Sequence, residues 1–344
     1  MSPAGMRPEP LRSPLFGSMD RFPGGIMIIP LVLGSLAGTF AAPALDIGSF
    51  TSGLFRDSAL PLIGLLIFAV GTQVNVRTGG AVMAHAGVLL VAKSFIPATL
   101  VVILGLFVGL DGIMGLSILA ILAASDNSNS GLWVAYTSKY GDSRDRGAFI
   151  GSALNDGPFL TLLFLGTSGL GEIPFTALLA SLAPLLLGVL VGNVDPRWRE
   201  IVRPTPNIVI PFFAFALGTA IDLRDVISGG LSGLVLGVLI APLTGGLCYL
   251  GYRLVLRRGG ESGVGFAAGT TAGNSIGTPA VVAAADPKFQ EYVGTATAQI
   301  AASVLVTALL APLLATWMLK RSGHLESMAE KAAVPDGEDP LPQH

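Results

Sequence analysis

Two polar, glycine-containing breaks interrupt apolar stretches of this chain and could bind a small polar anion. The first reads Ser-Asp-Asn-Ser-Asn-Ser-Gly over residues 125–131, and the second reads Asn-Ser-Ile-Gly-Thr-Pro over residues 274–279. Asn, Ser and Thr side chains offer donors and acceptors for hydroxyl groups. Where a break starts a new helix, free N–H groups and the helix dipole suit a carboxylate. The candidate substrate-binding residues are Asp126, Asn127, Ser128, Asn129, Ser130, Asn274, Ser275, Thr278 and, from another segment, Lys93.

Four ionisable residues lie in or beside apolar segments: Lys93, Asp126, Asp156 and Asp222. A charge at the centre of a bilayer costs about 2.5–3.5 kcal/mol, so each is expected to pair or to exchange a proton. One interpretation is a structural ion pair between Lys93 and an aspartate. The other makes Asp126, Asp156 or Asp222 a proton carrier. Asp222 lies near the end of its segment, where it could instead cap a helix.

The composition is typical of a membrane protein. Hydrophobic residues make up 51% of the 344 residues and charged residues only 12%, about half the charged fraction of a soluble domain. The 45 glycines include many inside apolar runs, which suits helices that pack closely in lipid. With one cysteine, Cys248, and three histidines, we expect no disulfide, metal site or cofactor. No basic stripe suggests nucleic acid as a partner.

Ten apolar runs approach the roughly 20 residues that a helix needs to cross a bilayer. The predicted fold class is therefore an all-α polytopic membrane protein with ten transmembrane helices. The runs lie near 23–41, 57–73, 81–109, 112–138, 146–168, 173–193, 206–222, 228–255, 263–285 and 290–319.

An internal repeat divides these runs into two halves of five. Residues 71–77 read GTQVNVR and residues 218–224 read GTAIDLR, and the same shift of 147 places Asn127 on Asn274. Because five is odd, the second half enters the membrane from the opposite side, so the repeats are expected to be inverted. The predicted domains are a disordered cytoplasmic segment (1–20), a first five-helix repeat (21–168), a second, inverted repeat (169–319) and a disordered cytoplasmic tail (320–344).

The basic residues fit this topology. Sixteen of the 20 Lys and Arg residues fall on the side that holds both termini, three (Arg56, Arg224 and Lys288) fall on the other side, and Lys93 lies within a span. Such an excess is typical of the cytoplasmic side, so we expect both termini there. Trp133 is expected to anchor its span at the membrane interface.

The two breaks lie in the fourth and ninth spans and predict two discontinuous helices that meet at the centre of the protein. The apolar part of the fourth span, residues 112–124, would form about 20 Å of helix, short of the ~30 Å hydrocarbon core. Pro279 disfavours a continuous ninth helix. Unwound backbone at this depth occurs where it is buried in protein or lines a cavity. Matching breaks in inverted repeats favour a substrate or ion site over simple helix capping.

Beyond these patterns, several stretches carry a resemblance to a known family. They are RFPGGIMIIPLVLGSL (21–36), GSFTSG (48–53), the first break, GNVDP (192–196) and IPFFAFALGTAIDL (210–223). Over about 21–320 the chain resembles the 2-keto-3-deoxygluconate permease family. The resemblance implies proton symport of 2-keto-3-deoxygluconate, a six-carbon sugar acid, across a bacterial inner membrane. It also implies the wider group that contains bile acid–sodium symporters, with ten helices and crossed, broken helices four and nine.

Three other functions stay open. The nearest is a sodium-coupled organic-anion symporter of the same fold, because Asn-rich breaks and backbone carbonyls could also hold Na⁺. The second is a cation/proton antiporter, which also uses crossed broken helices. The third, from another class, is an intramembrane aspartyl enzyme with Asp126 and Asp156 as its dyad.

Overall fold

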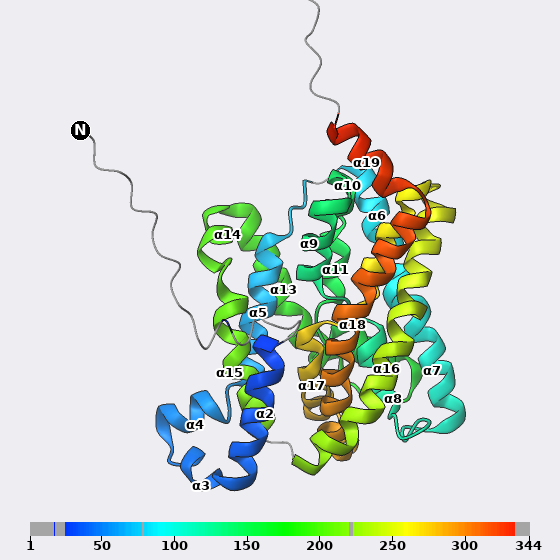
Figure 1. Ribbon diagram of the computed structural model, residues 1–344. Helices are drawn as coiled ribbons and strands as arrows, with labels where there is room; N and C mark the ends of the chain where they lie inside the picture. The colour runs from blue at the N-terminus through cyan, green and yellow to red at the C-terminus, as the bar shows by residue number, and fades with distance from the viewer. Residues whose placement is uncertain (1–16, 18–24, 78, 220–222, 334–344) are drawn as a thin grey trace, which may run out of the picture.

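The computed structural model describes residues 17, 25–77, 79–219 and 223–333, and the regular elements of this part of the chain are helices (Figure 1). The all-α prediction is confirmed. The elements are α2 (Gly25–Phe40), α3 (Ala42–Leu45), α4 (Ser49–Phe55), α5 (Ala59–Gln73), α6 (Gly80–Leu90), η1 (Val91–Phe95), α7 (Ile96–Val108), α8 (Ile118–Ser125), α9 (Ser130–Tyr140), α10 (Ser143–Gly147), α11 (Phe149–Asn155), α12 (Phe159–Ser168), α13 (Phe175–Val194), α14 (Arg197–Val202), α15 (Thr205–Thr219), α16 (Leu223–Leu250), η2 (Gly251–Val255), η3 (Gly260–Ala268), η4 (Gly273–Gly277), α17 (Thr278–Ala285), η5 (Pro287–Tyr292), α18 (Val293–Arg321) and α19 (His324–Ala333).

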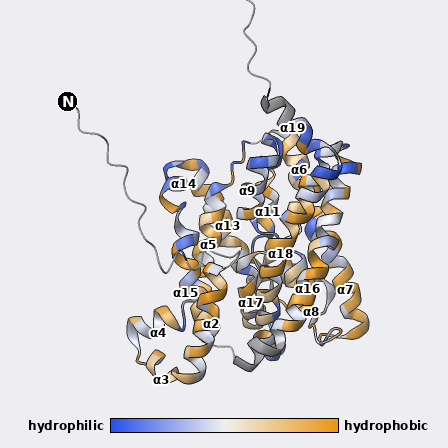
Figure 2. Cartoon of the chain, in the orientation of Figure 1, coloured by the Kyte–Doolittle hydropathy of each residue, from blue (hydrophilic) through white to orange (hydrophobic). Residues whose placement is uncertain are grey.

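Several of these helices are long and apolar enough to cross a membrane. Four meet that test alone, and six do if each of two bent helix pairs is counted as one span. Large apolar side chains such as Phe107, Phe175 and Leu231 are exposed, as expected for faces that contact lipid. Hydrophilic residues gather instead at the end of the molecule that carries α10, α14 and α19 (Figure 2). The chain is therefore a multi-pass helical membrane protein.

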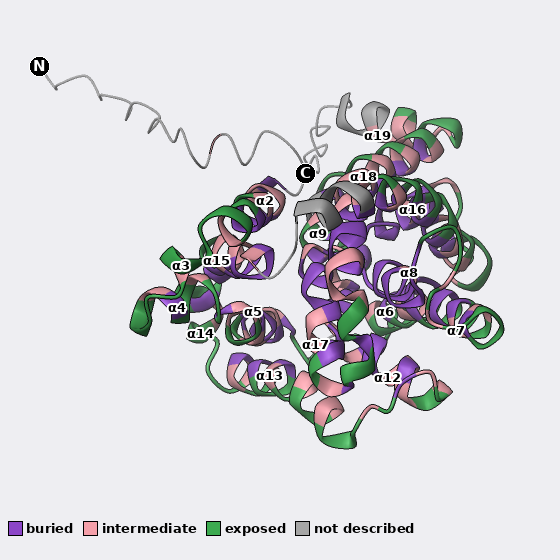
Figure 3. Cartoon of the chain, turned by 90° about the horizontal axis from the view of Figure 1, so that it is seen from below, coloured by how far each residue is buried: buried purple, intermediate pink, exposed green. Residues whose placement is uncertain are grey.

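The helices lie in two groups (Figures 1 and 3). The smaller group contains α2–α5 and α13–α15. The larger group contains α6–α12 and α16–α18, with both predicted breaks. The space between the two groups is where a site formed by both would lie.

Glycines let the helices of the smaller group approach closely, in two matching pairs. Helix α2 meets α15 where Gly34 faces Gly218, and α5 meets α13 where Gly71 faces Gly188. A Cβ atom at any of these four positions would overlap the backbone of the partner helix. Small residues allow this kind of contact between membrane helices.

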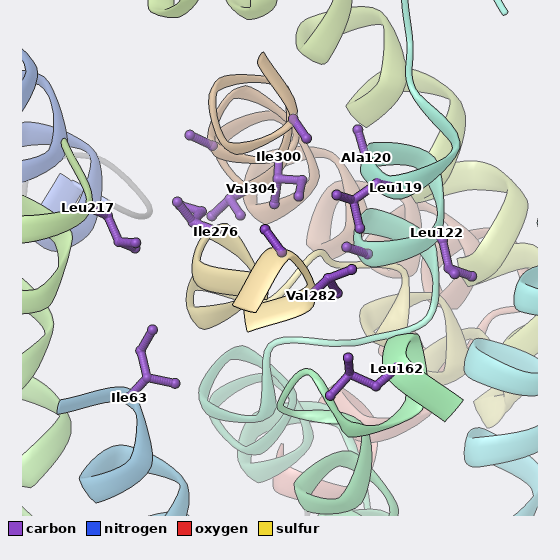
Figure 4. Packing of buried hydrophobic residues seen from close by; sticks show 14 of the residues in the cluster. Ile63, Leu119, Ala120, Leu122, Leu162, Leu217, Ile276, Val282, Ile300 and Val304 are labelled. Carbon is purple, nitrogen blue, oxygen red and sulfur yellow. The ribbon is translucent and has the colours of Figure 1, made fainter. Parts of the chain in front are cut away.

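Apolar side chains from both groups form the main core cluster (Figure 4). Ile63 and Leu217 come from the smaller group, whereas Ile276, Val282 and Val304 come from the larger one. The Cδ1 atoms of Ile63 and Leu217 both lie against Gly277, close to the second break. The two groups are therefore packed together around Gly277.

The predicted disordered tail is wrong for part of its length. Helix α18 continues to Arg321, Gly323 (φ +72°) follows it, and α19 occupies His324–Ala333. The apolar side chain of Leu325 packs on the cluster that contains Trp133 and Tyr252, and this burial of apolar surface stabilises the short helix. Residues 334–344, and the predicted 1–20 segment apart from residue 17, lie outside the described residues.

Trp133 is buried inside the protein, so its indole does not face lipid as that of an interfacial anchor would. Its side chain is only 1% exposed, and its indole Nε1 donates a hydrogen bond to the carbonyl oxygen of Asp145 at 2.9 Å. The aromatic content of a helix does not show which face turns inward, and here the partner carbonyl in α10 satisfies the indole N–H.

Candidate functional site

The first predicted break is present at residues 126–129, whereas the second lies a few residues earlier than predicted, at 269–272, because residues 274–277 belong to η4 and Pro279 lies in the first turn of α17. Most residues of both breaks are buried. Helix α8 ends at Ser125 and α9 begins at Ser130, with the side chain of Asn129 accepting a hydrogen bond from the backbone N–H of Leu132 at 2.9 Å. This is an N-cap, the local reason that α9 starts there. In the second break, residues 269–272 separate η3 from η4, and α17 follows with Pro279 in its first turn.

Hydrogen bonds join the two breaks directly. The side chain of Asn127, predicted to bind substrate, instead spans the breaks: its Oδ1 accepts from the N–H of Ala272 and its Nδ2 donates to the carbonyl of Ala123. The buried unwound backbone is thus satisfied by the opposite break. Two bonds join the breaks, Ala272 N to Asn127 Oδ1 (2.8 Å) and Asn129 N to Thr270 Oγ1 (2.9 Å), and a third runs from Thr271 Oγ1 to the carbonyl of Ala124 near the end of α8 (3.0 Å).

A third break places Asp156 between the other two. Helices α11 and α12 form a pair bent by 55° around residues 156–158, where Pro158 precedes α12. Asp156 Oδ2 accepts a hydrogen bond from Ser130 Oγ at 2.6 Å, and its backbone carbonyl accepts one from Asn274 Nδ2 at 2.9 Å. Asp156 therefore contacts residues of both predicted breaks.

Asp126 and Lys93 lie deeper in the larger group. Asp126 is 1% exposed, and its Oδ2 accepts a hydrogen bond from Thr161 Oγ1 at 2.7 Å. Lys93, in the π-helical segment η1, is fully buried and donates to the carbonyl of Ser125 at 3.1 Å and to Thr244 Oγ1 at 3.0 Å. Within the described ranges, none of the ion pairs includes Lys93. Lys93 thus binds the end of α8 rather than an aspartate.

The remaining predicted residues differ in their contacts, since Ser128 bonds α11, Ser275 bonds within its own turn and Thr278 Oγ1 has no partner among the described residues. Ser128 Oγ lies 3.0 Å from Ser152 Oγ and 3.2 Å from Asn155 Oδ1. Ser275 Oγ donates to the carbonyl of Ala272 within its own turn. Thr278 Oγ1 is buried and has no hydrogen-bond partner among the described residues. The predicted proton carrier Asp222 lies outside the described residues.

A cavity of about 380 Å³ lies between the two helix groups and is lined by four of the predicted residues. The smaller group supplies mainly apolar side chains such as Met27, together with the polar Asn207, and the larger group supplies the other polar side chains. Asn274 Oδ1 is buried without a hydrogen-bond partner in the described structure, so an acceptor is left free beside the cavity. The polar lining consists of Asn129, Ser130, Asp156, Asn207 and Asn274, with Gly131 and Leu132 from the first turn of α9.

A second cavity of about 500 Å³ shares Val70, Ser130, Gly131 and Pro206 with the first. Its lining includes residues of α10 and α14, two helices that lie at the same end of the molecule (Figure 1). We call this second cavity the vestibule. At the other end, Ile63 and Leu217 pack on Gly277, and Ile67 lies 3.5 Å from the Cβ position of Gly157. The central cavity therefore adjoins the vestibule on the side of α10 and α14.

Sequence reasoning missed several polar residues of this site, among them Asn155, Thr161, Thr270 and Thr271. Thr270 and Thr271 lie in the second break of the structure, just before the residues predicted for it, and Thr271 bonds to Ala124, the residue that the 147-residue shift places on it. The repeat could therefore have found Thr271. Asn155 bonds Ser94 and Ser128 from other helices, contacts for which the chain carries no spacing signal.

These features define a class: a polytopic helical membrane protein with a polar cavity between two helix groups, at a point where helices are interrupted. Within the described residues, no three His, Cys, Asp or Glu side chains gather as a metal ion would need.

Comparison with known proteins identifies the family. The sequence profile of the family described as 2-keto-3-deoxygluconate permease matches residues 16–324, and the chain belongs to this family. It is 41% identical over 315 residues to 2-keto-3-deoxygluconate permease 1 of Salmonella typhimurium, covering 92% of this chain and 98% of that protein. It is 38% identical over 310 residues to 2-keto-3-deoxygluconate permease of Bacillus subtilis, covering 88% and 93%. The family and these relatives are permeases rather than enzymes.

Proposed function

We propose that this chain takes up 2-keto-3-deoxygluconate, or a closely related sugar acid, together with protons by alternating access. The observation that carries the proposal is the cavity between the helix groups, where the start of α9 and a buried aspartate meet. Its volume of about 380 Å³ lies within the range of small-molecule sites. The substrate is taken from the printed names of the relatives.

The substrate carboxylate is proposed to bind at the N-terminus of α9. Ser130, Gly131 and Leu132 line the cavity with this helix start, where N–H groups and the dipole favour an anion. Sugar hydroxyls would bind Asn129, Ser130 and the free Oδ1 of Asn274. Lys93 does not line the cavity, so the structure favours the helix terminus over Lys93 as the carboxylate ligand.

Asp156 is proposed as the proton carrier. It lines the cavity and is hydrogen-bonded to Ser130, so its charge state is coupled to the residues that would hold the substrate. A monoanion entering an inside-negative cell loses about 2.3 kcal/mol per 100 mV, and one co-transported proton cancels that cost. Asp126, which is not in the cavity lining, is the second candidate. Asp222 stays a prediction.

Inverted repeats of five spans each are proposed for the fold. The paired glycine contacts support them, because α2 and α13 hold matching places in the repeat, as do α5 and α15. The α2–α15 contact at Gly34 and Gly218 thus has its counterpart in the α13–α5 contact at Gly188 and Gly71. Each helix pair joins one repeat to the other, as a twofold axis in the membrane plane requires.

Transport is proposed to occur by movement of the smaller group against the larger one. The cavity connects to the α10–α14 end, which the charge distribution assigns to the cytoplasm of a bacterial inner membrane. The structure would then be an inward-facing state. Opening the other end would separate Ile63 and Leu217 from Gly277.

Uptake into proteoliposomes tests the proposal. We expect 2-keto-3-deoxygluconate to accumulate when an inward proton gradient is imposed at zero sodium, and not when a sodium gradient is imposed at equal pH. Accumulation driven only by sodium would favour the sodium-coupled alternative, and absence of sugar-acid transport under both gradients would contradict the function. Asp57→Asn, at an exposed aspartate, should accumulate the sugar acid as the wild type does, and it is the control for the variants of the buried aspartates.

Labelling of single cysteines tests the topology. The starting variant is Cys248→Ser, since Cys248 is the only cysteine in the chain. In intact cells, a membrane-impermeant maleimide should label a cysteine at Asp111 but not one at Ser143. Labelling of the Ser143 position from outside would contradict cytoplasmic termini.

A further inference from the structure

The vestibule contains two arginines from opposite helix groups. Arg146 comes from α10 in the larger group, and Arg203 follows α14 in the smaller group. Gln73 adds an amide, while Phe149 and Val202 contribute apolar wall. Low-dielectric walls around charges of one sign concentrate the field inside a cleft. A small anion would therefore be attracted to this space.

The two guanidinium groups are only weakly engaged within the protein. Arg146 donates to the carbonyl of Gly141 at 3.4 Å, and Arg203 lies 3.4 Å from Glu200 in a pair whose side chains are about 70% exposed. Exposed pairs of this kind contribute little because water screens them. Most of the hydrogen-bonding capacity of both side chains remains available for a ligand.

We propose that the vestibule is a second anion site, in which Arg146 and Arg203 bind the carboxylate of a sugar acid between the central cavity and the solvent. This inference rests on the proposed function. Continuity supports it, because Ser130 and Gly131, at the proposed carboxylate site, also line the vestibule. Since the arginines belong to different helix groups, the bound anion touches both groups at the mouth of the cavity.

Binding is measured by protection of arginines from phenylglyoxal, with the modified residues located by mass spectrometry. The intact protein is used in inside-out vesicles. 2-Keto-3-deoxygluconate and gluconate should slow modification of Arg146 and Arg203, whereas glucose, which lacks a carboxylate, should not. Arg197 in α14 is the internal control, because it does not line the vestibule. Equal protection by glucose, or no protection by either acid, would overturn the proposal.

Transport rates give the second test. In inside-out vesicles at about 0.01 M salt and low substrate, Arg146→Gln with Arg203→Gln should slow entry of the sugar acid from the cytoplasmic face about tenfold. The difference should shrink at about 0.3 M salt, because the Debye length shortens. Arg146→Lys with Arg203→Lys should retain most of the rate, and Arg197→Gln should match the wild type.

The outcomes separate the two proposals. If wild-type protein transports no sugar acid, the proposed function fails. If the wild-type protein transports normally, and the sugar acid enters through the double Gln variant at the wild-type rate at both salt concentrations, the vestibule site is wrong while the function stands.

Discussion

Ser130 Oγ donates a hydrogen bond to Asp156 Oδ2 at 2.6 Å, which ties the start of α9 to the break between α11 and α12. Both residues line the central cavity. A ligand that accepts a hydrogen bond from Ser130 would compete with Asp156 for the same hydroxyl. Protonation of Asp156 would weaken its hold on that hydroxyl and leave the hydroxyl free to bond the ligand. This contact is the most direct link between a proposed substrate ligand and a proposed proton carrier.

Asp156→Asn is expected to abolish accumulation against a gradient while leaving exchange of internal for external sugar acid. The amide preserves the size of the side chain but cannot carry a proton at neutral pH. Proton-driven uptake and counterflow in proteoliposomes measure the two activities. If Asp126→Asn lost accumulation and Asp156→Asn retained it, the assignment of the carrier would be reversed.

Asn127→Ala is expected to destabilise the protein by about 1–3 kcal/mol, because the buried N–H of Ala272 would lose its partner. Thermal unfolding of purified protein in detergent measures the change. Thr167→Ala is the control, since that exposed hydroxyl bonds only within its own helix. A midpoint equal to that of the control variant would show that the bond between the breaks is not structural.

Gly34→Ala and Gly188→Ala are expected to destabilise the protein to a similar extent, by about 1–3 kcal/mol each, because each added methyl overlaps a backbone carbonyl of the partner helix. Gly64→Ala, where the new Cβ meets no atom within 4 Å, should be neutral or slightly stabilising. The unfolding midpoints of the three variants test this. Strongly unequal effects at Gly34 and Gly188 would argue against equivalent contacts in the two repeats.

Arg258 forms ion pairs with Asp142, Asp145 and Glu261, and the contribution of Asp142 to stability is expected to be lost in acid. Although partial burial raises the pKa of Asp142, hydrogen bonds from the Asp145 N–H and from Arg144, with the charge of Arg258, lower it to about 2. A depressed carboxyl pKa stabilises the folded state above the unfolded value near 4, and this contribution is lost as pH falls from about 4 to about 2. Because Asp142 is one-third exposed, we expect about 1 kcal/mol after screening.

Asp142→Asn keeps the helix cap but removes the charge, so it separates these two contributions. The midpoint of thermal unfolding should fall less steeply between about pH 4 and about pH 2 in this variant than in the wild type. Identical pH profiles would show that Asp142 titrates normally. Asp195→Asn serves as the control. Asp195 is another surface aspartate, and it takes part in none of the ion pairs of the described residues.

The class of protein, the position of the first break and several of the polar cavity residues follow from the sequence alone. Long apolar runs with few charges permit little except membrane helices. The polar run at 125–131 and Pro279 interrupt such helices through local chemistry, which needs no tertiary contact.

Which of the polar residues face the cavity depends on tertiary contacts that the sequence does not show. Asn127 and Asn129 are two residues apart, yet Asn127 spans the breaks while Asn129 lines the cavity. Lys93 bonds the end of α8, although its charge suggested an anion ligand or an ion pair. In unwound backbone no helical period relates residue number to direction, so the orientation of each side chain depends on its hydrogen-bond partners from distant segments.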